Sequence, residues 1–148
     1  ERADSIFAAL KAISLDDACV VVHDAARALT PAAMVSRVVD AVLGGAPAVV
    51  PVVPVADTVK RVSGEIVEAT LDRSALRAAQ TPQGFDLGML REANEKYLAE
   101  KPAFVATDDA SLMEWFGVPV ATVEGDPMAF KITTPLDLRL AESVVGAL

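Results

Sequence analysis

The sequence lacks most of the residues on which common catalytic and metal sites depend. Its 148 residues include one cysteine and one histidine, so the chain can supply neither a disulfide framework nor a zinc cluster of its own. A Ser-His-Asp triad would need His23 as its base, but His23 ends an apolar run, where a structural imidazole is the more common outcome. Walker A, GxGxxG and GxSxG motifs are also missing, which removes the usual signatures of nucleotide binding and serine hydrolysis.

Long apolar runs and an excess of positive charge are missing as well. No apolar run approaches the roughly 18 residues of a membrane span. The net charge of −8 argues against an extended nucleic-acid-binding surface. We therefore expect neither a membrane nor a nucleic acid among the partners. The lone Cys19 and the absence of a basic-then-apolar signal pattern indicate a reducing, cytoplasmic location.

The residues that are abundant are apolar. Hydrophobic residues make up 53% of the chain and the mean hydropathy is +0.39. These values are high for a small protein, so we expect a partner or further chain to cover part of the apolar surface. The length itself suffices for one domain with a sizeable core.

An alternation of strand and helix patterns predicts an α/β fold. Residues 18–23 form a β-branched run typical of a fully buried strand in a parallel sheet. Thr30–Pro31 predicts an N-cap followed by proline in the first helical position, and Gly44–Gly45 ends that helix. Residues 46–53 predict a second buried strand, so the segment reads as a βαβ unit.

The middle of the chain differs from this pattern. Residues 57–71 contain two alternating runs around Ser63–Gly64, which predict a half-exposed hairpin able to reach a second subunit as an arm. The other expected elements are a first helix capped by Asp4 or Ser5, a helix over about 86–98, a helix after residues 107–111 that ends at Gly117, strands at 119–125 and 128–134, and a last helix capped by Thr134.

Asp24 and Arg27 are the first candidates for chemistry. They follow the strand at 18–23, and ligands of open α/β sheets bind at the carboxyl ends of the strands. An ion pair that merely closes the loop explains this pair equally well. The acidic segment at residues 107–111 has a stronger structural explanation, because Thr and Asp are ordinary N-cap residues.

Several cations lie at predicted strand ends or on the hairpin of this acidic chain. Arg73 directly follows the hairpin, where a solvated charge is the more common explanation. Lys131 interrupts a short apolar run, and a lysine is costly to bury without a partner, which favours a function. Together with Arg27 and Lys60, these residues would suit a phosphate-bearing substrate if the fold brings them together.

Several segments resemble, in this order, the 2-C-methyl-D-erythritol 4-phosphate cytidylyltransferase family. They are ERADS, VVVHDAAR, PVADTVK, LDRSALRAAQTPQGF, TDDASLMEW and VEGDPMAFKITTPLDLRLAE. The resemblance extends over the whole chain. VHDAAR alone would also match the related ribitol 5-phosphate cytidylyltransferases, but its combination with TPQGF and KITTPLDL is specific. The resemblance implies that CTP and 2-C-methyl-D-erythritol 4-phosphate give a CDP-alcohol and pyrophosphate, with Mg²⁺, in non-mevalonate isoprenoid biosynthesis.

The resemblance also implies an architecture. The family has a Rossmann-like nucleotidyltransferase domain, three-layered around a mostly parallel sheet, and forms a homodimer whose β-arms cross between subunits; the hairpin at 57–71 corresponds to that arm. The family opens with a glycine-rich loop whose arginine and lysine cradle the triphosphate. That loop is not in this sequence, so we expect residues 1–148 to be the C-terminal portion of the domain and to be inactive alone.

The resemblance further implies roles for individual residues. Asp24 is expected to be catalytic and to lie near the ribose, the substrate and the metal, with Ala25 beside the ribose and Ser5 at the cytosine end of CTP. Arg73 is expected to reach the substrate phosphate from across the dimer, and Lys131 to bind that phosphate and act in catalysis. The expected substrate-binding residues are Arg27, Thr58, Arg73, Thr81, Thr107 and Lys131.

Two other functions remain open. The substrate could be ribitol 5-phosphate, or the chain could be a non-catalytic, dimerising fragment that binds the substrate. Turnover of CTP separates an enzyme from such a fragment.

Overall fold

A mixed β-sheet runs through the centre of the computed structural model, which describes the backbone of residues 2–147 and the side chains of residues 5–147. The helices are α1 (Arg2–Ala12), α2 (Ala32–Leu43), α3 (Leu87–Glu100), α4 (Asp109–Phe116) and α5 (Pro135–Gly146), with 3₁₀ turns η1 (Arg73–Ala75) and η2 (Pro127–Ala129). The strands are β1 (Cys19–Val22), β2 (Ala48–Pro54), β3 (Lys60–Ser63), β4 (Ile66–Thr70), β5 (Arg77–Ala79), β6 (Gln83–Asp86) and β7 (Val120–Glu124).

The order of strands confirms the α/β class but corrects the expected pairing. β1 and β2 run in the same direction, as a helical crossover through α2 requires. However, β6 lies between them and runs antiparallel to both. β5 pairs antiparallel with the far end of β2, and β7 pairs parallel with the other edge of β2. Among the described pairings, only β2 with β7 is parallel, because the chain returning from the hairpin enters the sheet between the two strands of the βαβ unit.

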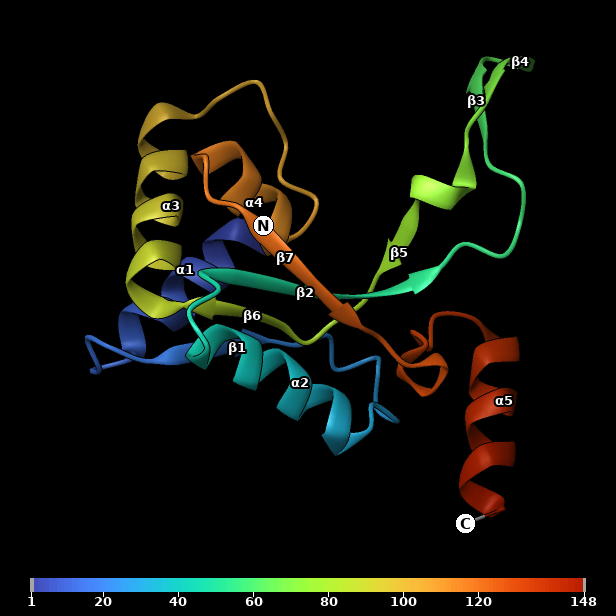
Figure 1. Ribbon diagram of the computed structural model, residues 1–148, viewed down its shortest axis with the longest axis horizontal. Helices are drawn as coiled ribbons and strands as arrows, with labels where there is room; N and C mark the ends of the chain where they lie inside the picture. Colours follow the sequence, from blue (N-terminus) through green and yellow to red (C-terminus); the bar gives the residue numbers. More distant parts are fainter. Residues whose placement is uncertain (1, 148) are drawn as a thin grey trace.

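Helices α1, α3 and α4 cover one face of the sheet and α2 covers the other, which gives the expected three layers, while α5 stands apart from the sheet (Figure 1). Successive strand residues point to opposite faces, and Ala48 and Val49 belong to different core clusters accordingly. Ala48 packs in the cluster that contains Phe85, Leu90 of α3 and further residues of α4. Val49 packs with apolar side chains of α2. The core therefore lies on both sides of the central strand β2.

The first strand is less buried than its sequence predicted. β1 covers Cys19–Val22, its residues are mostly half-buried, and Val21 is 39% exposed. Within the described residues β1 pairs on one side only, with β6, so the prediction of a fully buried strand in a parallel sheet is wrong here.

Two predicted helix starts also change. Pro31 itself is the N-cap of α2, while the Thr30 hydroxyl donates a 2.8 Å hydrogen bond to the Arg27 carbonyl instead of capping the helix. α1 already includes Asp4 and Ser5, so neither of them is its N-cap.

The end of the chain contains a turn where a strand was expected. Residues 128–134 form no strand, because Asp126 caps η2 with Pro127 in its first turn and the chain then continues irregularly. The predicted cap of the last helix is confirmed: Thr134 and Asp137 form a reciprocal capping box at the start of α5. Gly117 ends α4 in the left-handed conformation, with φ of +90°, as predicted.

The hairpin is confirmed and projects away from the sheet (Figure 1). We call residues 57–71 the arm. Its two-residue turn is Gly64–Glu65, one position later than expected, and Gly64 has a positive φ of 56° that suits glycine. Val62, Ile66 and Val67 are 57%, 72% and 54% exposed, so the arm presents apolar side chains to its surroundings.

The helices between residues 2 and 147 are all too short or too polar to span a membrane.

Candidate active site

Asp24 lies just beyond the end of β1 and faces two cations. Its Oδ2 is 3.2 Å from Lys131 Nζ and 3.4 Å from Arg27 Nε. The Asp24 and Arg27 side chains are 20% and 13% exposed, whereas the Lys131 side chain is 47% exposed. The fold therefore brings together three predicted site residues, and Lys131 is the one that can most easily meet a ligand. We call Asp24, Arg27 and Lys131 the Asp24 cluster.

Backbone contacts fix the two loops that carry this cluster. Arg27 Nη1 donates a 2.7 Å hydrogen bond to the Ala129 carbonyl, and the Ile132 amide donates a 2.8 Å bond to the Ala26 carbonyl. Lys131 was predicted to need a partner because of burial in a strand. It lies instead in a half-exposed loop, but the structure does give it a partner in Asp24.

Thr81 holds the backbone of Asp24 in place. The hydroxyl oxygen of Thr81 accepts a 2.9 Å hydrogen bond from the Asp24 amide and lies 3.0 Å from Nδ1 of His23. Only 5% of Thr81 is exposed. Its contacts in the structure are thus with the loop that holds Asp24, and a direct contact of Thr81 with substrate stays a prediction.

Two buried glutamines near Thr81 were missed by the sequence analysis. Gln83, 2% exposed, donates from Nε2 to Asp108 Oδ2 at 2.8 Å and accepts from the Ala110 amide at 3.0 Å. Gln80, 6% exposed, makes a similar pair of hydrogen bonds with the backbone of Asp126. The signal was available, because two amides interrupt a run of small and apolar residues and a buried amide needs partners.

Further candidates are the nucleotide-side residues Ala25 and Ser5 and the acidic segment at residues 107–111. Asp108, not Thr107, is the N-cap of α4, and the exposed Thr107 donates its amide to the Ser111 hydroxyl. The structural explanation for this segment is therefore confirmed. Ala25 is exposed beside Asp24, and Ser5 is exposed on α1.

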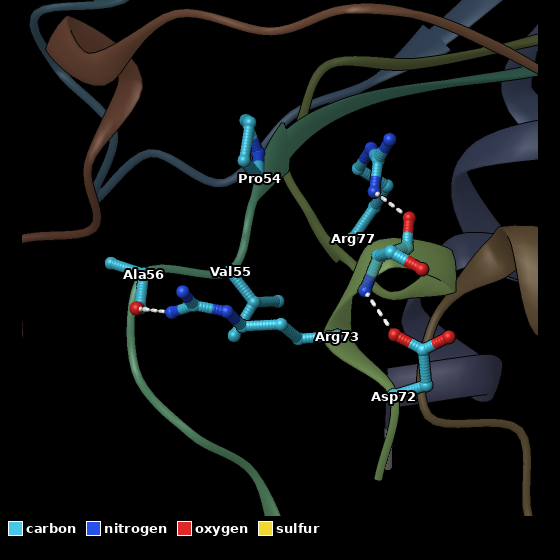
Figure 2. Close-up of a pocket in the computed structure, with 7 residues that line it drawn as sticks. Pro54, Val55, Ala56, Asp72, Arg73 and Arg77 are labelled. Atoms are coloured by element: carbon cyan, nitrogen blue, oxygen red, sulfur yellow. Dashed lines mark hydrogen bonds between the residues drawn. The ribbon is translucent and has the colours of Figure 1, made fainter.

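Arg73 lies elsewhere, in a pocket of about 600 Å³ at the base of the arm (Figure 2). The pocket is lined by Pro54, Val55, Ala56, Asp72, Arg73, Ser74 and Arg77. Figure 2 shows Arg73 extended toward the Ala56 carbonyl, to which it donates a hydrogen bond. Arg77 Nη1 donates to the carbonyls of Ser74 and Leu76. Thr58 is exposed near the start of the arm.

The charge of this pocket is positive on balance. Neither arginine pairs with a carboxylate within residues 5–147, since their hydrogen bonds go to backbone carbonyls. Asp72 is engaged with Ser74, whose backbone amide and side chain hold the pKa of the Asp72 carboxyl below its ordinary value of 3.8. Guanidinium groups without a paired carboxylate suit an anionic ligand such as phosphate. Within the described part of the chain, the Arg73 guanidinium bonds to the Ala56 carbonyl and makes no hydrogen bond with the Asp24 cluster.

Asp24 is the predicted ligand of a Mg²⁺ ion, and its surroundings can be compared with what that ion requires. Among the described side chains, no three acidic, histidine or cysteine residues gather as metal ligands. Mg²⁺ usually keeps several waters and takes one or two carboxylates together with substrate phosphates. Asp24 therefore fits as a single protein ligand of an ion that a nucleotide brings with it.

Comparison with known proteins gives one consistent answer. A sequence profile of the family described as 2-C-methyl-D-erythritol 4-phosphate cytidylyltransferase matches residues 1–147. Proteins of that name from Corynebacterium efficiens and Corynebacterium diphtheriae are each 62% identical, over 97% of this chain. The chain spans 58% and 59% of their lengths. The crystal structure of the enzyme of that name from Thermus thermophilus has 42% identity and a TM-score of 0.87, over 99% of this chain and 70% of the other.

Proposed function

Since the chain belongs to the 2-C-methyl-D-erythritol 4-phosphate cytidylyltransferase family, we propose that it takes part in cytidylyl transfer from CTP to 2-C-methyl-D-erythritol 4-phosphate. An oxygen of the substrate phosphate attacks the α-phosphorus of CTP, and the bond from that phosphorus to the bridging β-phosphate oxygen breaks. The products are the CDP-alcohol, in which the new bond completes a diphosphate, and pyrophosphate. The reaction belongs to non-mevalonate isoprenoid biosynthesis.

The observation that carries this proposal is the position of Lys131 against Asp24. Lys131 Nζ lies 3.2 Å from Asp24 Oδ2, yet the lysine side chain is 47% exposed. An ammonium group has three N–H donors, so Lys131 can keep its contact with Asp24 and still bind a phosphate oxygen of the substrate. Such a contact orients the attacking oxygen and offsets its charge, which is the main protein contribution to this class of reaction.

Asp24 and Arg27 orient the reacting groups in this proposal. Arg27 is largely buried and tied to the Ala129 carbonyl, so it fixes the Asp24 carboxylate. Mg²⁺ is the proposed cofactor, with Asp24 as its protein ligand; when bound, the ion offsets the negative charge of the phosphates. The small side chain of Ala25 lets the ribose approach the backbone, and Ser5 is the proposed contact for the cytosine.

We further propose a homodimer in which the arm of one subunit completes the site of the other. The exposed apolar side chains of the arm support this assembly, because they bury little area within their own chain. Arg73, at the base of the arm, then reaches the substrate phosphate of the partner's site, with Thr58 beside the substrate. Its guanidinium pairs with no carboxylate in the described chain, which suits this role.

The relatives support methylerythritol phosphate over ribitol 5-phosphate, because the two Corynebacterium proteins and the Thermus enzyme are named for the former. CTP and this sugar-alcohol phosphate are therefore the proposed small-molecule partners. A cytoplasmic location stays a prediction that rests on the lone, half-buried Cys19.

Pyrophosphate release tests the proposal. Two proteins are assayed. One is this chain alone, and the other joins the chain to the part of the Corynebacterium efficiens relative that the chain does not cover. We call the second the completed protein. We expect the completed protein to release pyrophosphate from CTP with 2-C-methyl-D-erythritol 4-phosphate, and much more slowly with ribitol 5-phosphate. A folded, dimeric protein that binds the sugar-alcohol phosphate but releases no pyrophosphate would establish the non-catalytic alternative.

A further inference from the structure

Gln80 connects the loop that carries Lys131 to the centre of the sheet. Its Nε2 donates to the Asp126 carbonyl at 2.9 Å, and its Oε1 accepts from the Asp126 amide at 2.9 Å. The side chain thus satisfies both backbone groups of one residue in the loop that follows β7. Gln80 is 6% exposed, so these hydrogen bonds are shielded from competing water.

The backbone at Gly125 and Val52 packs closely against the Gln80 side-chain amide. The Gly125 amide donates to the Val52 carbonyl at 2.8 Å, which brings the loop against β2. A Cβ added at Gly125 would collide with Oε1 of Gln80 and lie 3.0 Å from the Val52 carbonyl oxygen. Glycine at this position is therefore what allows Gln80 to reach Asp126.

Thr81, the residue after Gln80, holds the loop on the other side of the Asp24 cluster, the one that carries Asp24. Thr81 accepts the Asp24 amide, whereas Gln80 holds Asp126, five residues before Lys131. Two adjacent side chains consequently bind the two loops whose side chains meet in the Asp24–Lys131 pair.

We propose that Gln80 is a positioning residue that sets the place of Lys131 for binding the substrate phosphate. The inference rests on the proposed function for the identity of the ligand. The position of Lys131 itself does not depend on that function and can be measured separately.

The first test measures how readily Lys131 reacts with an amine-acetylating reagent, by mass spectrometry of its peptide, relative to Lys101 in the same protein. Gln80→Met keeps the side-chain length but removes both hydrogen bonds, and Gly125→Ala displaces the same amide from the other side. We expect Lys131 to react about threefold to tenfold faster in either variant, the factor that the loss of about one net hydrogen bond gives.

Two matched variants control for general destabilisation. Asn94→Leu removes another buried amide, which is 1% exposed and bonded to the Leu90 carbonyl within α3. Gln83→Met removes an amide that holds the start of α4 instead of the Lys131 loop. We expect neither control to change the reactivity of Lys131. An unchanged Lys131 in Gln80→Met and Gly125→Ala, or an equal change in Asn94→Leu, would overturn the proposal.

The second test is kinetic and uses the chain completed to the length of its relatives. Gln80→Met should raise the KM for the sugar-alcohol phosphate about threefold to tenfold while the KM for CTP changes less than about twofold. An equal loss for both substrates would contradict the assignment. If the completed protein shows no turnover with CTP, the proposed function fails, and the acetylation result still decides whether Gln80 positions Lys131.

Discussion

The Asp24 cluster and the arm contrast in how they are held. The cluster is tied to distant parts of its own chain, through Thr81, Ala129 and the loop that Gln80 binds. The contacts of the arm stay largely within the arm, as in the exposed pairs Lys60–Thr70 and Arg61–Glu68. Exposed ion pairs contribute little to stability. The Asp24 cluster is therefore held by contacts with the rest of the described chain, whereas the arm leaves apolar and cationic side chains exposed.

This difference explains why the two sets of predicted phosphate ligands lie apart. Lys131 and Arg27 are placed by packing and buried hydrogen bonds, which a single chain can provide. Arg73 is placed at the junction of the arm with the sheet, where its guanidinium donates to a backbone carbonyl. If the arm docks on a second subunit, the partner determines what Arg73 meets. Substitutions in both regions test this division, and the largest effect is expected at Asp24.

Asp24→Asn should abolish most activity while leaving the fold in place. The amide has nearly the shape of the carboxylate but not its charge, so Lys131 and Arg27 lose their shared counter-ion. We expect turnover in the completed protein to fall about 100-fold or more, with a loss of less than about 2 kcal/mol in the free energy of unfolding. Kinetics and thermal denaturation check this, and unchanged activity with a lowered melting temperature would make Asp24 a structural residue.

Loss of Arg73 or Lys131 should weaken binding of the sugar-alcohol phosphate selectively. A charge-assisted contact to phosphate contributes about 1.5–3 kcal/mol, so Arg73→Ala and Lys131→Ala should each raise the KM for this substrate about 10- to 100-fold. The KM for CTP should change much less. Arg73→Lys should restore only part of the loss, because an ammonium cannot make the two-pronged contact of a guanidinium. A defect confined to CTP would contradict the assignment of both residues.

Mixing the two variants distinguishes an arm that acts across the dimer from one that acts within its subunit. In statistically exchanged dimers of Arg73→Ala and Lys131→Ala chains, half the dimers are hybrids, and each hybrid has one site with both groups intact. About a quarter of all sites should then regain activity. If subunits exchange but no activity returns, Arg73 and Lys131 act in the site of the same subunit. The arm then does not contribute Arg73 to the partner's site.

Charge on the arm should affect assembly more than folding. Ile66 is 72% exposed, so Ile66→Asp should change the free energy of unfolding of the subunit by no more than about 0.5 kcal/mol. It should nevertheless shift a dimer toward monomer, measured by sedimentation. Leu43→Asp is the control, because Leu43 is 70% exposed on α2 and outside the arm. Equal effects of both substitutions on assembly would show that the arm is not the interface.

The sequence predicted the locally encoded features and missed those that depend on distant pairing. The arm, the βαβ crossover and the capping box at Thr134 follow from periodicity and cap residues, and all are present. The insertion of β6 between β1 and β2 was missed, because a run of strand-forming residues does not specify its neighbours. The partner of Lys131 likewise depends on the route of the loop after η2, and Gln80 could be assigned only once its distance from Asp126 was known.

The smallest predicted effect concerns two surface carboxylates, Asp137 near the Asp24 cluster and Asp72 at the base of the arm. Asp137 accepts hydrogen bonds from the amides and hydroxyls of Thr133 and Thr134, next to the Lys131 loop, and these bonds lower its pKa from 3.8 to about 2. A carboxyl whose pKa is lower in the folded state stabilises that state above its ordinary value, and this contribution disappears as the pH falls toward 2. The start of α5 should therefore loosen between about pH 4 and pH 2, detected by exchange of the Thr133 and Thr134 amides.

Carbon NMR titration of the side-chain carboxyls measures these pKa values directly. Asp137 should titrate near 2, and Asp72 at the base of the arm should also titrate below 3.8, since both accept hydrogen bonds within their own turn. Asp137→Asn should remove the acid-dependent loosening at α5 and leave Asp72 unchanged. If Asp137 titrates at 3.8, its capping contacts do not persist in solution, and the loop that carries Lys131 is then held by Gln80 and by its hydrogen bonds to Ala26 and Arg27 without them.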